Sequence, residues 1–183
     1  MAFKVKKSIV MVGMMGAGKT AVGQALAARL SVPFLDSDEE IVRAANMTIA
    51  EIFERDGEQF FRDRETEVIG RLLDGECAIL STGGGAFMAD RNREMISERG
   101  VSVLLRADIE LLWNRVRHKD TRPLLRTRDP KATLREIYDV RVPVYEKADL
   151  AVDAHPDYSI AQMTDAVIDV LRTRPDVLEE TTG

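Results

Sequence analysis

The sequence predicts an α/β fold in which a mostly parallel sheet is covered by helices on both faces. Three observations support this fold class. Short apolar segments alternate with segments of helical periodicity along nearly the whole chain. A glycine-rich loop joins the first predicted strand to the first predicted helix. The chain has 183 residues, of which 45% are hydrophobic, and this length and composition suit a single domain with one core.

Five short apolar segments are predicted to be strands. The first is a β-branched run that leads directly into the glycine-rich loop, as expected of a buried strand. Because strands that alternate with helices form parallel sheets, ligands are expected beyond the carboxyl ends of these strands. The predicted strands are residues 8–12, 32–36, 77–81, 101–105 and 148–154.

The helices predicted in the first half of the chain have recognisable starts and stops. The first, over residues 19–30, carries apolar side chains at spacings of four, at Val22, Leu26 and Leu30. Thr48 and Glu51 form a capping box, and Gly75 ends the longest of these helices. The remaining segments with this pattern are residues 37–46, 49–57 and 58–75.

Four more helices are predicted in the second half. Gly100 ends one of them, and Asp108 caps the next. Pro143 is expected to kink or break the helix that begins at Asp129 or Pro130. The polar tail over residues 175–183 is expected to be flexible. The four helices are residues 90–100, 108–118, 129–148 and 156–174.

The glycine-rich loop predicts a phosphate-binding site. It matches G-x-x-x-x-G-K-[ST] without a mismatch, between a strand and a helix. Its backbone N–H groups can turn inward around an anion, and the helix N-terminus adds its dipole. Lys19 is expected to reach the outer phosphates of ATP or GTP, and the Thr20 hydroxyl to ligate Mg²⁺. A turn that binds nothing is the alternative. The predicted loop residues are Gly13, Met14, Met15, Gly16, Ala17, Gly18, Lys19 and Thr20.

Two further motifs follow strands and should reach the same edge of the sheet. Asp36 and Asp38 are two residues apart, so they face the same way if the chain stays extended. One carboxylate would hold the Mg²⁺ shell and the other would accept a proton, unless Ser37 or Asp38 merely caps a helix. Three consecutive glycines at 83–85 indicate close approach to a ligand, with a simple turn as the alternative.

Basic residues are concentrated in one segment of an otherwise acidic chain. Guanidinium groups there are suited to phosphates, although a solvated face is the alternative. Elsewhere, Arg62 and Arg64 are two residues apart on one helix, so at most one of them faces a shared site. The basic residues of the segment are Arg115, Arg117, Lys119, Arg122, Arg126 and Arg128.

Composition excludes several classes of protein. The formal net charge of −5 argues against a general nucleic-acid binder. No apolar run approaches the roughly 18 residues needed to span a membrane. Cys77 is the single cysteine, so an intramolecular disulfide is impossible and a cytoplasmic protein is expected. Nothing in the sequence requires more than a monomer.

Six motifs, in this order and spacing, resemble those of the shikimate kinase family: GMMGAGKT, FLDSD, FFRDRE, STGGGAF, RPLL and RVPVYEKAD. The resemblance covers residues 9–171. It implies a three-layer α/β/α kinase fold with a central five-stranded parallel sheet. It also implies transfer of the ATP γ-phosphoryl group to the 3-hydroxyl of shikimate, in the pathway to chorismate and aromatic amino acids.

The resemblance also implies residue roles. Asp38, Lys19 and Arg122 would be catalytic, with Asp38 as the candidate base. The metal ligands would be Thr20 and Asp36, the latter through water. ATP would be contacted by the phosphate loop together with Arg115, Arg117, Arg122, His155 and Pro156. Shikimate would be bound by Asp38, Arg62, Gly83, Gly84, Gly85 and Arg141.

The implied organisation is a single kinase domain over residues 1–174, with a lid at about 117–130 and substrate-binding helices at about 38–74. Two alternatives remain at this stage. One is another small-molecule kinase of the same fold, such as a gluconate or adenylate kinase. The other is a non-catalytic switch that only binds a nucleoside triphosphate.

Overall fold

A computed structural model describes residues 2–118 and 126–182. Its centre is a five-stranded sheet in the order β3 (Phe34–Asp36), β4 (Ile79–Ser81), β2 (Ser8–Val12), β5 (Gly100–Arg106) and β6 (Leu150–Asp153). Every neighbouring pair in this sheet is parallel. The predicted five-stranded parallel sheet is therefore confirmed.

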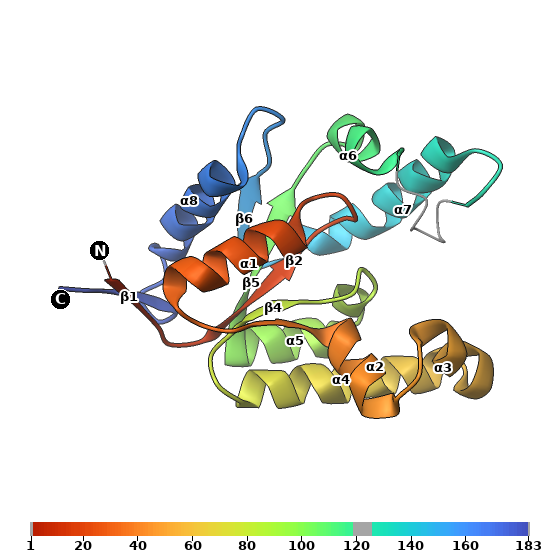
Figure 1. Cartoon of the computed structure of the whole chain (residues 1–183), viewed down its shortest axis with the longest axis horizontal. Coiled ribbons are helices and arrows are strands. Elements are labelled where there is room, and N and C mark those ends of the chain that lie inside the picture. Colours follow the sequence, from red (N-terminus) through yellow and green to blue (C-terminus); the bar gives the residue numbers. More distant parts are fainter. Residues whose placement is uncertain (1, 119–125, 183) are drawn as a thin grey trace.

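Helices cover both faces of the sheet (Figure 1). Helices α1 (Lys19–Leu30) and α8 (Ile160–Leu171) pack together on one face. Helices α4 (Glu58–Asp74) and α5 (Asp90–Arg99) cover the other, together with the short 3-10 helix η1 (Ala86–Met88). The core between these layers is apolar, and the β2 residues from Ile9 to Val12 are almost completely buried in it. Their burial is the main favourable contribution to this arrangement.

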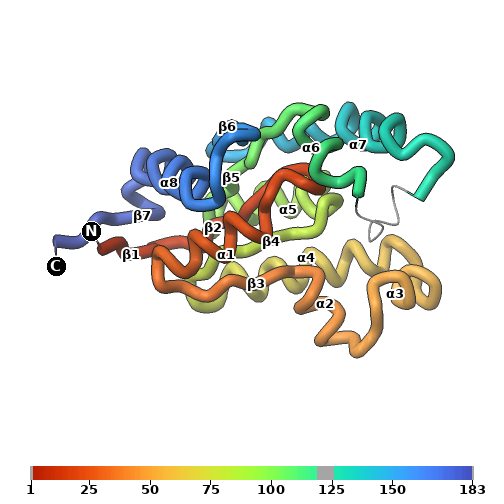
Figure 2. Tube along the Cα trace, turned by 45° about the horizontal axis from the view of Figure 1, so that its top comes forward, coloured from red at the N-terminus to blue at the C-terminus, as the bar shows by residue number. Residues whose placement is uncertain are grey.

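Two groups of helices extend past the carboxyl ends of the strands (Figure 2). One contains α2 (Ser37–Ala45) and α3 (Ile49–Asp56), which pack with α4 around a small apolar cluster of their own. The other contains α6 (Ile109–Val116) and α7 (Pro130–Tyr145). The sheet edge between the two groups is where the sequence places its polar motifs.

The structure differs from the sequence prediction at the two ends of the chain. Strand β1 (Ala2–Val5) pairs antiparallel with β7 (Leu178–Thr181) in a separate two-stranded sheet. The segment 175–183 was expected to be flexible, but its Val177 and Leu178 side chains are buried against the core. Burial of these two side chains in the core and pairing of β7 with β1 hold this part of the chain in place. Strand β1 is at the other end of the sequence, so local sequence patterns do not reveal the pairing.

Helix α7 also runs through Pro143 instead of breaking there. The helix ends two residues later, at Tyr145, so the proline lies in its last turn. Within residues 2–118 and 126–182, none of the helices combines the length and the apolar character that crossing a membrane requires.

Candidate functional site

The loop between β2 and α1 has the geometry of a phosphate cradle. Gly16 and Gly18 have φ angles of +84° and +99°, where residues with a β-carbon are strained. Gly18 is the N-cap of α1, and no side chain caps the first N–H groups of this helix. From α6, the Arg115 guanidinium donates hydrogen bonds to the carbonyl oxygens of Gly16 and Ala17, at 3.0 and 3.3 Å. Arg115 thus fixes the backbone of the loop, and the N-terminus of α1 favours binding of an anion.

A cavity of about 830 Å³ opens in front of this loop. Its walls come from both halves of the chain, and its volume is within the range of ligand sites, roughly 300–1,000 Å³. The predicted site residues that line it are Met14, Met15, Gly16, Ala17, Gly18, Lys19, Thr20, Asp36, Asp38, Gly83, Gly84, Arg115 and Arg141.

Asp36 and Asp38 both line the cavity, although not in the extended geometry that the sequence suggested. Helix α2 begins at Ser37, and Asp36 is its N-cap. Oδ1 of Asp36 accepts the backbone N–H groups of Asp38 and Glu39, at 2.9 and 3.1 Å. Neither Ser37 nor Asp38 is the capping residue. Both carboxylates line the cavity because helix α2 begins between the two residues, with Asp36 as its cap and Asp38 in its first turn.

The Asp38 carboxylate lies directly on Gly83. A β-carbon at Gly83 would be 2.8 and 2.9 Å from the two oxygens of that carboxylate, closer than real contacts allow. None of the three glycines at 83–85 has a positive φ angle. The first glycine is therefore required for space and not for backbone conformation.

The other two glycines lie against arginines in the same way. A β-carbon at Gly84 would collide with the guanidinium of Arg141. At Gly85 it would be 2.6 Å from Nη2 of Arg62. The run thus brings one carboxylate and two guanidinium groups against a bare backbone. Contact of this backbone with a ligand stays a prediction.

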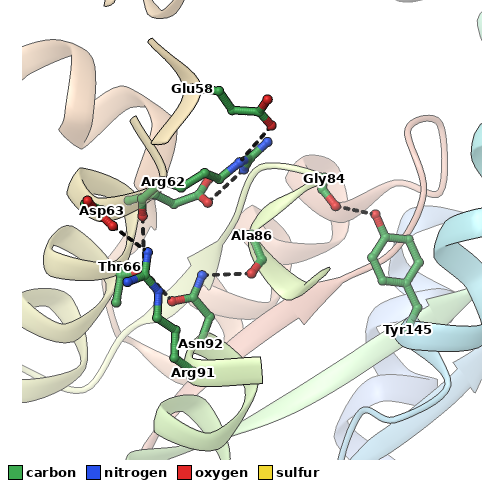
Figure 3. Close-up of polar contacts among 10 residues, drawn as sticks. Glu58, Arg62, Asp63, Thr66, Gly84, Ala86, Arg91, Asn92 and Tyr145 are labelled. Atoms are coloured by element: carbon green, nitrogen blue, oxygen red, sulfur yellow. Dashed lines mark hydrogen bonds and ion pairs between the residues drawn. The ribbon is translucent and has the colours of Figure 1, made fainter. Parts of the chain in front are cut away.

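Arg62 is held by carboxylates on its own helix. Its Nη1 donates to Glu65 at 2.9 Å. Its Nε lies 3.8 Å from the carboxylate of Glu58 (Figure 3). The Glu65 side chain is only 1% exposed, so this ion pair is largely shielded from solvent. Arg64 instead pairs with Glu67 on the exposed surface. Arg62 therefore lies against the glycine run, whereas Arg64 is held on the surface. That Arg62 serves the site stays a prediction.

The environment of Asp38 makes it a hydrogen-bond and proton acceptor. Burial raises the pKa of Asp38, and the neighbouring Asp36 raises it further, while Lys19 and Arg62 act in the opposite direction. Oδ1 of Asp38 is buried and has no hydrogen-bond partner in the described part of the chain. A buried acceptor without a partner is costly, and a ligand hydroxyl would satisfy it.

Some predicted residues do not line the cavity. Arg62 and Gly85 are among them, and they lie against each other. Gly13 is buried at the end of β2, where it packs against the β5 backbone. Arg117 is exposed, as are His155 and Pro156. Arg122 lies outside the residues that the structure describes, so its role stays a prediction.

Several residues that the sequence interpretation missed belong to the site or support it. Tyr158, Ile160 and Met163 line the cavity from the start of α8. Glu65 accepts a hydrogen bond from Arg62, and Tyr145 donates one to the backbone of Gly84. The last two had a detectable signal: they follow predicted site arginines by three and four residues, which places each pair on one helix face.

The oxygen donors present suit a Mg²⁺ ion. Among the residues described, no three His, Cys, Asp or Glu side chains gather to hold a metal. Mg²⁺ does not need such a group, because it typically takes one or two protein oxygens together with substrate phosphates. Thr20 and Asp36 line the cavity and offer such oxygens. Oδ1 of Asp36 serves the helix cap, whereas Oδ2 is not part of it.

Comparisons with known proteins agree with this geometry. A family profile described as "Shikimate kinase" matches residues 15–172. The chain is 70% identical over 173 residues to the shikimate kinase of Ruegeria pomeroyi, covering 94% of this chain and 89% of the relative. It is 64% identical over 176 residues to that of Cereibacter sphaeroides, covering 96% and 88%.

Solved structures give the same result. The shikimate kinase from Acinetobacter baumannii, in complex with shikimate, has a TM-score of 0.82 at 38% identity, covering 91% of this chain and 93% of the other. A gluconokinase from Sinorhizobium meliloti has a TM-score of 0.60 at 20% identity, covering 93% and 94%. The second likeness shows the fold alone.

Proposed function

The chain belongs to the shikimate kinase family, and on this premise we propose how its cavity transfers the γ-phosphoryl group of ATP to the 3-hydroxyl of shikimate. The observation that carries the proposal is the glycine run at 83–85. Asp38, Arg141 and Arg62 each lie against one of these glycines. Asp38 and Arg141 also line the same cavity as the phosphate loop. A carboxylate base and a pair of guanidinium groups match an acceptor that has hydroxyls and one carboxylate.

In the nucleotide half, the phosphates of ATP bind along the loop 13–20, where Lys19 reaches the outer phosphates. Arg115 lines the cavity whereas Arg117 does not, and this favours Arg115 as the arginine near the nucleotide. His155 and Pro156 remain proposed contacts of adenine. They are supported by Tyr158, which lines the cavity and whose ring lies 4.5 Å from that of His155.

In the acceptor half, Arg62 and Arg141 bind the carboxylate of shikimate, and the glycine backbone forms the floor. Asp38 accepts the hydrogen bond of the 3-hydroxyl through its unpartnered Oδ1 and takes the proton as the oxygen attacks phosphorus. Its raised pKa brings it closer to the operating pH, which improves a general base. Alignment of the two substrates supplies much of the rate, because phosphoryl transfer needs little covalent help.

Thr20 and Asp36 would hold Mg²⁺, which neutralises phosphate charge when bound. Arg122, in the proposed lid over residues 117–130, would add positive charge at the transferred group. We propose a single kinase domain that works as a monomer, because residues from both halves of the chain line one cavity.

The test is an ADP-release assay with Mg²⁺ and ATP, in which shikimate, gluconate and AMP are offered separately. We expect turnover with shikimate alone. Arg141→Ala should raise the KM for shikimate by on the order of tenfold or more, because a charged hydrogen bond is lost. Arg135→Ala, which removes an exposed arginine of the same helix, is the matched control. Comparable turnover with gluconate, or an unchanged KM in Arg141→Ala, would contradict the assignment.

A further inference from the structure

A buried tyrosine connects two walls of the acceptor half of the cavity. Tyr145 is the last residue of α7, and it is only 1% exposed. Its hydroxyl donates a hydrogen bond to the carbonyl oxygen of Gly84 at 2.6 Å (Figure 3). Its ring packs against Phe87 of η1, with ring centroids 6.4 Å apart. One side chain therefore contacts the glycine run with its hydroxyl and the segment that follows the run with its ring.

The same hydroxyl interacts with Arg141. The two residues are four positions apart on α7, so their side chains lie on the same face of the helix. The Arg141 guanidinium and the Tyr145 hydroxyl both lie against Gly84, where a β-carbon would be 3.6 Å from the hydroxyl and would collide with the guanidinium. Burial raises the pKa of Tyr145 above its ordinary value of 10.0, although the positive charge of Arg141 acts to lower it, so the hydroxyl keeps its proton at neutral pH. It can then donate to Gly84 while its oxygen lies next to the positive charge of Arg141.

We propose that Tyr145 is a positioning residue for shikimate binding, which sets where Arg141 lies relative to the backbone of Gly84. Both of these residues line the cavity, whereas Tyr145 does not. The inference rests on the proposed function, in which Arg141 binds the carboxylate of the acceptor. It assigns Tyr145 no contact with either substrate.

A second anchor of the loop shows why Tyr145 is distinctive. Asn92 on α5 is 1% exposed and donates to the carbonyl oxygen of Ala86 at 2.8 Å (Figure 3). Its Oδ1 accepts from the Thr66 hydroxyl, also at 2.8 Å. This anchor fixes the loop to α5 and α4, on the side away from α7. Tyr145 instead connects the loop to α7, the helix that carries Arg141. Its hydroxyl therefore influences the distance between the Arg141 guanidinium and the Gly84 backbone.

The test is Tyr145→Phe, which keeps the ring and removes only the hydroxyl. Tyr138→Phe is the matched control, because it removes a hydroxyl from the same helix at a half-buried position. Shikimate and ATP are titrated separately into each variant by calorimetry. We expect Tyr145→Phe to weaken shikimate binding by on the order of tenfold, or about 1.4 kcal/mol. We expect the Kd for ATP to stay within about twofold, since the lost hydrogen bond joins Tyr145 to Gly84 and not to the phosphate loop, and separate sites respond almost independently. Tyr138→Phe should change neither.

A double-mutant cycle separates this inference from the proposed function. If Tyr145 acts through Arg141, Tyr145→Phe should weaken shikimate binding much less in the Arg141→Ala background than in the wild type. Additive effects, equal weakening of shikimate and ATP, or wild-type shikimate affinity in Tyr145→Phe would each overturn the positioning role. If Arg141→Ala itself binds shikimate normally, the proposed function fails and this inference fails with it.

Discussion

Substituting Gly83 by alanine tests whether the position of the Asp38 carboxylate controls the reaction. The new β-carbon would lie 2.8 Å from the nearer carboxylate oxygen, whereas ordinary contact begins at 3.4 Å. The carboxylate must therefore move by about 0.6 Å. Because the second oxygen is almost equally close, at 2.9 Å, rotation of the carboxylate cannot relieve the contact.

Such a displacement should be costly for catalysis and cheap for stability. A misplacement of about 1 Å in a reacting geometry can cost about 10²-fold, so we expect kcat to fall by on the order of 10- to 100-fold. The atoms that must yield are the end of a side chain, and the φ angle at Gly83 is not positive. The loss of folding free energy should therefore be below about 1 kcal/mol, which lowers the melting temperature by no more than about 4 °C.

The assay compares steady-state kcat and thermal unfolding for Gly83→Ala and Gly75→Ala. Gly75 is the matched control. It lies outside the cavity, and a β-carbon there would be 3.6 Å from its nearest neighbours, which is ordinary contact. Gly83→Ala is also measured in the Asp38→Ala background, where the displaced group is absent and little further loss is expected. A folded Gly83→Ala enzyme with kcat within twofold of wild type would refute the reasoning. So would an equal loss in the two backgrounds.

Three other predictions concern the site and the chain ends. Asp38→Asn should lower kcat by about 10²-fold or more and raise the melting temperature at pH 7.5. The folded-state pKa of Asp38 is raised, mainly by burial, so its ionisation above the ordinary value of 3.8 destabilises the fold. The gain should shrink as the pH falls toward 4.5, and a lower melting temperature at both pH values would contradict it. Arg115→Ala should raise the KM for ATP about tenfold or more, because two charged hydrogen bonds to the phosphate loop are lost; the KM for shikimate is the control. Deleting residues 177–183 removes buried Val177 and Leu178, which should cost about 3–6 kcal/mol in thermal or urea unfolding. The kcat at 25 °C should persist, since β7 lies at the end of the molecule away from the cavity (Figure 1).

Local sequence rules explain why so much of the fold was predictable. The phosphate loop, the capping box at Thr48 and the glycine that ends α4 involve residues within one or two turns of one another. Their geometry depends on backbone conformations that the residue types themselves favour. The alternation of strands and helices then leaves few topologies other than a parallel sheet.

Short-range patterns in the chain are enough to predict the strand–loop–helix phosphate cradle, the parallel sheet and the types of residue available for catalysis. Two features of the site become visible only in the folded chain: Asp36 caps the helix that carries Asp38, and three glycines lie against one carboxylate and two guanidinium groups. Folding also pairs the chain ends as β1 and β7. These contacts join residues far apart in the chain, where packing and burial, and not local propensity, choose the partners.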